Sequence, residues 1–385
     1  MENKEIQEII NLYDSQKLDL AEKEVVKLIK TEPNNSILFN ILGAILTGKK
    51  RFDQAIINYK KSIKINPNYA EAYNNLGIAL NETKKFDESI DSYKKAIQIK
   101  SDFAEAYNNL GVVFKKLEKF DQSINSYLKA IKIKSNYAEA YYNYGNVLGE
   151  INKIEEAISN YKKAIKLDAN FAKAYNNLGN LLKDITKTKE ACEFLDKLMI
   201  IKPSHIGYKI NRKLLIPPIC ESIQEIDHYR NEYEEGLKFL EKYKHFNENP
   251  SQSIGTHFFY LAYHNKDNLK IMKSTSNLFK KIIPNINYIS KNIKIPKKNK
   301  KIKIGFISEF LTNHTIGRIF EGLIKNLNRK KFEILVFHTA QTKKGLLKDE
   351  IDSSVNKVVD LPNKIIVQHQ LIEKENLDIL FYTDI

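Results

Sequence analysis

Residues 70–77 read AEAYNNLG, and residues 104–111 repeat the same eight letters. Near copies follow at the same spacing, with AEAYYNYG at 138–145 and AKAYNNLG at 172–179. The glycine of this motif recurs as Gly43, Gly77, Gly111, Gly145 and Gly179. Self-similarity at a fixed period of roughly 20–50 residues is typical of proteins built from stacked structural units.

Each unit is predicted to be a pair of antiparallel helices. Tyr73 and Leu80 lie on one face of a first helix, and Ile90 and Tyr93 lie on one face of a second. A small residue, such as Gly77, is needed where the two helices cross. One unit cannot bury its own apolar face, so the units must stack into a superhelix with a concave groove.

This is the tetratricopeptide pattern. We predict an α-solenoid of these repeats over residues 1–205, with five full units that begin at 36, 70, 104, 138 and 172. Residues 1–35 are interpreted as a degenerate capping unit.

One polar column stands out on the first helices. It consists of Asn75, Asn109, Asn143 and Asn177, and the first full unit departs from it with Ile41. A side-chain amide carries both donors and acceptors, so this ladder can bracket a peptide backbone without reading its sequence. The alternative is that asparagine is common in this chain and only caps or solvates a helix face. Asparagine is a mediocre helix former, which favours the peptide-binding reading.

Composition excludes several classes of protein. The chain has 385 residues and a formal net charge of +15, but only five of its 62 basic residues are arginines. The lysines are spread over the whole chain, so we predict no nucleic-acid partner. The longest apolar stretch, Ile37–Leu46, is far shorter than the ~20 residues of a membrane span. The first residues show no secretory signal and the two cysteines show no metal or redox spacing, so a cytoplasmic protein is expected.

Residues 206–300 lose the phase of the repeats and are predicted to form a helical connector. Helices are expected over Glu221–Tyr243 and Leu269–Ile283. An aromatic block between them carries His257 and His264, which could lie on one face of a helix. Without a third ligand nearby, packing is favoured over metal binding. A lysine-rich stretch at Lys294–Lys303 is interpreted as a linker.

Strands alternate with helices in residues 301–385. Apolar strands are predicted at 302–307, 332–337, 358–361 and 377–382, with helices at 316–328 and 364–375. This alternation indicates a parallel sheet and a Rossmann-like half-domain. Ligands of such sheets lie beyond the carboxyl ends of the strands.

The loop after the first strand, residues 308–317, therefore carries the candidate site. It holds His314, whose neutral imidazole could hold a substrate hydroxyl or phosphate or move a proton. Gly317 would let the next helix begin close to a ligand. The loop has no GxGxxG motif, so a dinucleotide site is not supported.

The stretch KIKIGFISEFLTNHTIGR (301–318) resembles the start of the catalytic region of the protein O-GlcNAc transferases and SPINDLY proteins. PPICESIQEIDHYRNEYEEGL (217–237), FFYLAYHNKDN (258–268) and LDILFYTDI (377–385) resemble further parts of bacterial members of that family. The resemblance implies a glycosyltransferase of the two-lobed GT-B type, which transfers N-acetylglucosamine from its UDP donor to Ser or Thr of proteins.

The resemblance also assigns roles. His314 matches the family's first-lobe histidine that approaches the sugar and the acceptor, and the asparagine ladder matches the family's acceptor-binding column. No metal and no cofactor are expected. Residues 301–385 correspond to an incomplete first lobe, so we expect the chain to be C-terminally truncated, to bind acceptor peptides, and to need the missing second lobe for the nucleotide sugar and for activity.

Two alternatives stay open. One is a tetratricopeptide scaffold for protein–protein interaction without catalysis. The other is a transferase with a different donor sugar, such as the fucose that SPINDLY proteins use.

Overall fold

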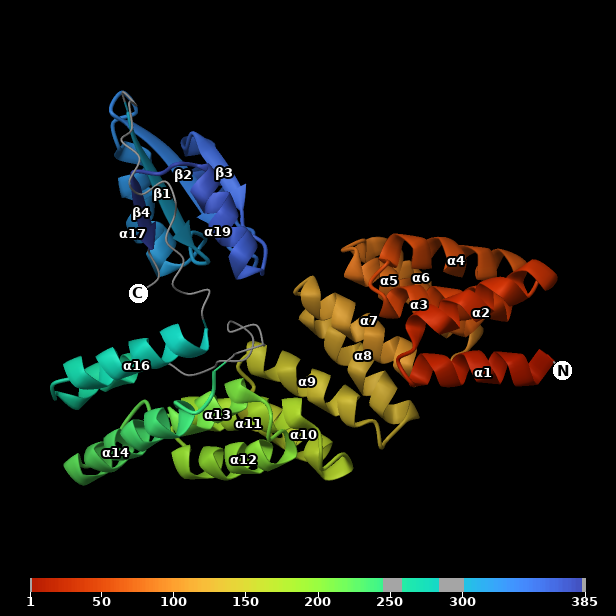
Figure 1. Ribbon diagram of the computed structural model, residues 1–385, viewed down its shortest axis with the longest axis horizontal. Helices are drawn as coiled ribbons and strands as arrows, with labels where there is room; N and C mark the ends of the chain where they lie inside the picture. Colours follow the sequence, from red (N-terminus) through yellow and green to blue (C-terminus); the bar gives the residue numbers. More distant parts are fainter. Residues whose placement is uncertain (1, 245–257, 284–300, 383–385) are drawn as a thin grey trace. The chain divides into compact units, whose positions relative to one another are not determined.

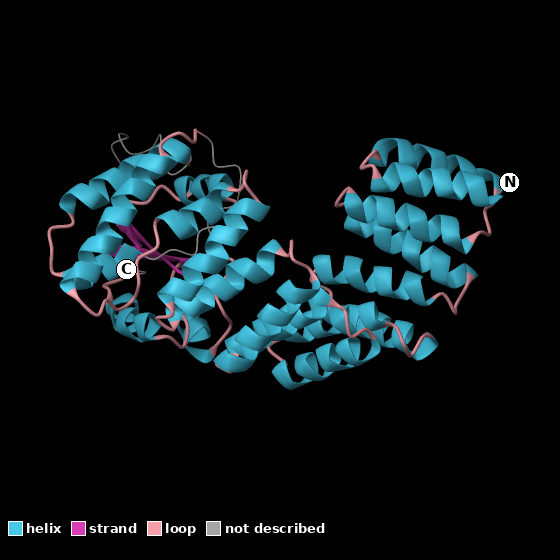
Figure 2. Cartoon of the chain, turned by 90° about the horizontal axis from the view of Figure 1, so that it is seen from below, coloured by secondary structure: helices cyan, strands magenta, loops and turns pink. Residues whose placement is uncertain are grey.

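The computed structural model describes residues 2–244, 258–283 and 301–382. The chain divides into two compact units, and Figures 1 and 2 show their helices and strands. The first holds Met1–Tyr208 and Pro217–Glu221, and the second holds Lys209–Ile216 and Ser222–Ile385. His257 and most of the predicted linker lie outside the described residues.

The repeat region consists of paired helices along its whole length (Figure 1). The pairs are α1 (Glu2–Asp14) with α2 (Leu18–Thr31), α3 (Ser36–Gly48) with α4 (Phe52–Ile65), α5 (Ala70–Glu82) with α6 (Phe86–Ile99), α7 (Ala104–Lys116) with α8 (Phe120–Ile133), α9 (Ala138–Glu150) with α10 (Ile154–Leu167), and α11 (Ala172–Asp184) with α12 (Thr188–Ile201). The first helix of each full unit begins at the predicted residue, so the predicted solenoid is confirmed.

In the first four full units the repeated glycine faces a repeated tyrosine ring, and in the fifth Gly179 faces Leu195. A Cβ atom added to Gly77 would lie 2.6 Å from the ring of Tyr93, and one added to Gly111 would lie 2.7 Å from the ring of Tyr127. Both tyrosines are almost completely buried. The glycine therefore lets the second helix approach closely enough for its tyrosine to pack against the first helix.

The turn inside each unit contains a residue in the left-handed backbone region. These residues recur with the period of the repeat and none is glycine: Gln16, Lys50, Lys84, Glu118, Asn152 and Thr186, with φ between 57° and 64°. Sequence patterns did not reveal this feature, because the turn is recognised by glycine or asparagine and only Asn152 fits that rule.

The described part of the connector consists mainly of helices. It contains α13 (Ile206–Lys213), α14 (Ile223–Leu240), the 3₁₀ helix η1 (Phe258–His264) and α16 (Leu269–Ile282). The Tyr233 hydroxyl joins α14 to α16 through the Thr275 hydroxyl at 3.0 Å. The phase of the repeats extends further than the sequence indicated, because α13 begins at the position equivalent to the first residue of α11.

The C-terminal strands form a parallel sheet of order β3-β2-β1-β4. The strands are β1 (Ile302–Ser308), β2 (Phe332–His338), β3 (Lys357–Asp360) and β4 (Ile379–Tyr382). Register pairs Ile302 with Phe332 and Ile304 with Ile379. The four predicted strands and their parallel pairing are confirmed.

Helices pack on both faces of the sheet. α17 (Thr315–Asn326) and α18 (Leu346–Ser354) cover one face, where Phe306 and Val336 meet Ile324 and Ile351. α19 (Ile365–Lys374) contributes to the core on the other face, which contains Phe337. α18 was not predicted, because a short helix with few apolar residues leaves little periodic signal.

Candidate functional site

The asparagine ladder lies on the first helices α5, α7, α9 and α11, and all four side chains are partly exposed. Each ladder amide donates a hydrogen bond to the preceding unit. The Asn109 Nδ2 lies 3.1 Å from the Asn74 Oδ1, and the Asn143 Nδ2 lies 3.0 Å from the Asn108 Oδ1. One N–H of each of these amides is therefore engaged inside the solenoid.

The acceptors form a second, buried asparagine column one position earlier in the chain. Its members are Asn40, Asn74 and Asn108, with 9%, 7% and 1% of their surfaces exposed. At the equivalent position of the next unit the residue is Tyr142. Sequence reasoning missed this column, although the doublets at 74–75 and 108–109 were a visible signal.

Asn211 stands in ladder phase on α13, one repeat period after Asn177. It is 2% exposed, unlike the four partly exposed members. The accessible ladder of this chain therefore comprises Asn75, Asn109, Asn143 and Asn177.

His314 lies at the carboxyl edge of the sheet, in the loop after β1. It is the N-cap of α17, and its Nδ1 accepts a hydrogen bond from the Ile316 N–H at 3.3 Å. That bond places the proton of the neutral ring on Nε2. The ring is exposed and stacks on Phe310, with ring centroids 4.5 Å apart. His314 thus presents a donor at Nε2 from a ring held by two contacts.

This loop follows the strand at which the order of the sheet reverses. β1 lies between β2 and β4, so the strand order reverses at β1. Ligands of open α/β sheets bind where the order reverses. Thr342 from the loop after β2 donates to the carbonyl of Ser308 at 3.3 Å, which joins the two loops at this edge.

Gly317 was expected to let the next helix begin close to a ligand, but the structure shows a different reason for a glycine here. A Cβ atom here would lie 2.2 Å from the Thr312 carbonyl oxygen and 2.9 Å from the Phe310 carbonyl oxygen. Gly317 therefore allows α17 to begin against the backbone of its own preceding loop. In the described structure its absent side chain faces protein and not an open site.

A cluster of polar and charged side chains, buried at His338 and partly exposed at Lys348 and Asp352, lies at the end of β2 and was not predicted. The His338 Nε2 is 2.6 Å from Asp352 Oδ1, and the Lys348 Nζ is 2.6 Å from Asp352 Oδ2. His338 is 1% exposed, and its Nδ1 has no hydrogen-bond partner among the described residues. The cluster ties α18 to β2 beside the His314 loop.

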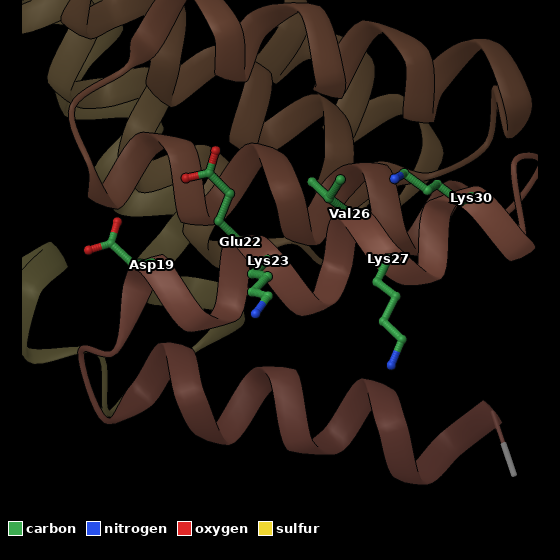
Figure 3. Close-up of a pocket in the computed structure, with 6 residues that line it drawn as sticks. All are labelled: Asp19, Glu22, Lys23, Val26, Lys27 and Lys30. Atoms are coloured by element: carbon green, nitrogen blue, oxygen red, sulfur yellow. The ribbon is translucent and has the colours of Figure 1, made fainter.

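Other candidates do not converge on a site. His264 is 5% exposed, and burial, followed by Arg230 and Lys266, lowers its pKa. A hollow over α2 is lined by six residues of that helix alone (Figure 3). Its acids Asp19 and Glu22 both pair with Lys49, at 2.5 Å and 2.6 Å.

The described residues contain no group of three His, Cys, Asp or Glu side chains arranged to hold a metal ion. None of the described helices has both the length and the hydropathy that crossing a membrane requires.

Comparison with known families identifies the repeats. Models described as TPR repeat match residues 43–84, 79–118, 113–152 and 145–185, and a tetratricopeptide repeat model matches 172–205. Residues 43–205 are therefore tetratricopeptide repeats. No curated protein has significant sequence similarity to the chain.

Several solved structures are similar to parts of the chain. MamA is 29% identical, with 43% of this chain and 98% of MamA covered at a TM-score of 0.39. YrrB, described as a TPR protein with an unusual peptide-binding site, is 24% identical over 47% of this chain and 94% of YrrB, with a TM-score of 0.37. An O-GlcNAc transferase of Thermobaculum terrenum is 14% identical over 81% of this chain and 45% of that protein, with a TM-score of 0.41. These values are too low to assign a function.

Proposed function

We propose that the repeats bind an extended polypeptide through the ladder of Asn75, Asn109, Asn143 and Asn177. Tetratricopeptide repeats serve protein interaction, and the ladder gives that general role a specific contact. The observation that carries the proposal is the regular series of four partly exposed amides, one in each of four successive units. A polypeptide in extended conformation offers unpaired backbone N–H and C=O groups that such amides can bind.

The hydrogen bonds inside the solenoid leave this capacity intact at Asn109 and Asn143, whereas both the amide nitrogen and the amide oxygen of Asn177 are already engaged within the chain. An amide has two N–H donors and an acceptor oxygen, and Asn109 and Asn143 each use one N–H within the chain. The Oδ1 and the second N–H stay available for a ligand. A scaffold in which the ladder only joins the units would need none of these groups to be accessible.

Binding can be tested on the full chain with a peptide selected from a random peptide display library. We expect the double substitution Asn109→Ala with Asn143→Ala to weaken this peptide's affinity by roughly tenfold or more, because two ligand hydrogen bonds are lost. The matched control is Asn58→Ala with Asn160→Ala, since both asparagines lie on second helices and donate only to their own helix. Equal affinities of the ladder variant and the control variant would refute the proposal.

A second candidate function extends the first. In this reading the bound polypeptide is an acceptor for O-glycosyl transfer, with N-acetylglucosamine as the expected sugar, and residues 301–382 belong to a Rossmann-like lobe. The observation that favours it is His314, which presents Nε2–H at the strand-order reversal of the sheet. There Nε2–H can bind a hydroxyl oxygen of a sugar or an acceptor.

This second function can be tested with O-(N-acetylglucosaminyl)-serine amide as the probe. Its binding should shift the imidazole ¹H–¹³C resonances of His314, whereas serine amide alone should not. His314→Ala should abolish the binding, with Phe310 and α17 unchanged in their own spectra. If the sugar-bearing probe leaves the His314 resonances in place, a sugar-transfer role for this loop is refuted, and the polypeptide-binding proposal is unaffected.

A further inference from the structure

The buried asparagine column has a defined relation to the ladder. Three ladder amides donate to it with nearly the same geometry: Asn75 to Asn40 at 3.1 Å, Asn109 to Asn74 at 3.1 Å, and Asn143 to Asn108 at 3.0 Å. In each pair the acceptor lies on the first helix of the preceding unit. The ladder residue and the residue that holds it thus come from different repeats.

The acceptor is itself oriented in the first of the three cases, where the Asn40 Nδ2 donates to the Tyr69 hydroxyl at 3.2 Å. Exchanging the amide nitrogen and oxygen of Asn143 alone would place its oxygen against the Asn108 oxygen. Two facing acceptors repel each other and leave a partly buried group unsatisfied, so the amide is held in one orientation.

The fourth ladder residue is held by different groups. Tyr142 replaces asparagine in the buried column, and the Asn177 Nδ2 donates to the Tyr142 hydroxyl at 3.2 Å and to the Asn146 Oδ1 at 2.8 Å. The donor is again the ladder Nδ2, and the acceptors again lie in the preceding unit. All four ladder amides are therefore fixed from the same side.

We infer that Asn40, Asn74 and Asn108 are positioning residues for polypeptide binding, each of which orients the ladder amide of the following unit. This inference rests on the proposed function of the ladder. The buried residues do not touch the ligand. They fix the direction in which the ladder presents its remaining donor and acceptor, and so reduce the ordering that binding requires.

The test is a double-mutant cycle on the full chain, with the library-selected peptide as the probe. Asn108→Leu is expected to weaken peptide affinity by about 3- to 10-fold, the effect of one hydrogen bond. In the Asn143→Ala background the same substitution should have no further effect, because Asn108 acts through Asn143. A role in unit stability alone would give the same loss in both backgrounds, and that result would overturn the inference.

A control keeps the result decisive. Ser123→Ala removes a buried hydrogen bond to the Gly111 carbonyl at 2.8 Å in the same unit but away from the ladder, and it should leave affinity unchanged. Loss of affinity in this control would show that unit stability is responsible, and would refute the positioning role.

If Asn108→Leu does not fold, the cycle moves to Asn74→Leu and Asn109→Ala, with the same expected non-additivity. Asn143→Ala also distinguishes a failure of the proposed polypeptide binding from a failure of the positioning role. If it has no effect on affinity, the proposed function fails and the inference fails with it. If it weakens binding but Asn108→Leu does not, the proposed function stands and only the positioning role is wrong.

Discussion

The close approach at Gly317 predicts opposite effects for two glycine substitutions in the same helix. Gly317 lies in the first turn of α17, and an added Cβ would meet the Thr312 carbonyl oxygen at 2.2 Å. At Gly322, in the same helix, an added Cβ would meet nothing within 4 Å. Alanine should therefore destabilise the helix at Gly317 and stabilise it at Gly322.

The magnitudes follow from two opposing effects. Glycine to alanine in a helix gains about 1 kcal/mol from propensity, which is the whole effect expected for Gly322→Ala. At Gly317 the contacts are backbone atoms of Phe310 and Thr312, which no side-chain rotation can relieve. This clash is more severe than ordinary overpacking, which costs about 1–3 kcal/mol. After the gain of about 1 kcal/mol from helix propensity is subtracted, Gly317→Ala should lower the free energy of unfolding by about 2 kcal/mol or more.

The displaced group also supports the candidate site. The Thr312 carbonyl accepts the His314 N–H at 2.6 Å, so moving it disturbs the backbone of His314. Gly317→Ala should consequently weaken binding of the sugar-bearing serine probe, whereas Gly322→Ala should leave it unchanged.

Hydrogen exchange measured by mass spectrometry on peptides from 301–326 is the suitable assay, because the chain has no tryptophan and its far-UV signal is dominated by the repeats. Gly317→Ala should accelerate exchange of the α17 amides by at least about 25-fold, and Gly322→Ala should slow it about fivefold. If Gly317→Ala slows exchange as Gly322→Ala does, the steric explanation of this glycine is wrong.

Three further predictions concern stability. Thr186 is β-branched yet has φ of 64°, so Thr186→Gly should raise the free energy of unfolding by about 1 kcal/mol in thermal melts of the full chain. Burial raises the pKa of Tyr127 above its ordinary value. The neutral phenol therefore contributes its full stabilisation below the unfolded-state pKa of about 10, and this contribution declines at higher pH. Urea melts of Tyr127→Phe should show a smaller decrease in the free energy of unfolding between about pH 9 and pH 11 than those of the wild type. Asp352→Ala removes the partner of His338 and Lys348 and should destabilise the α18–β2 contact by about 2 kcal/mol, visible as faster exchange in 346–354 but not in 223–240.

The sequence predicts those features that depend on local periodicity. The repeat boundaries follow from glycines and tyrosines that recur with one common period, because each pair meets inside its own unit. The parallel strands follow from apolar runs between helical segments. By contrast, the bond between Asn143 and Asn108 joins side chains of different units, and its geometry depends on how the units stack. The His338–Asp352 contact depends in the same way on where α18 packs.

The asparagine doublets show why stability alone cannot separate a structural ladder from a binding ladder. Asparagine costs several tenths of a kcal/mol relative to a good helix former, and one hydrogen bond between units returns about 1 kcal/mol. The pair Asn109 and Asn74 could therefore persist for stacking alone. Stacking, however, requires only that the two amides satisfy each other, and it sets no requirement that one of them stay partly exposed. Binding, in contrast, requires a ladder amide that is accessible and a buried amide that orients it. Coupling of Asn109 and Asn74 in ligand affinity therefore distinguishes a binding ladder from a structural one.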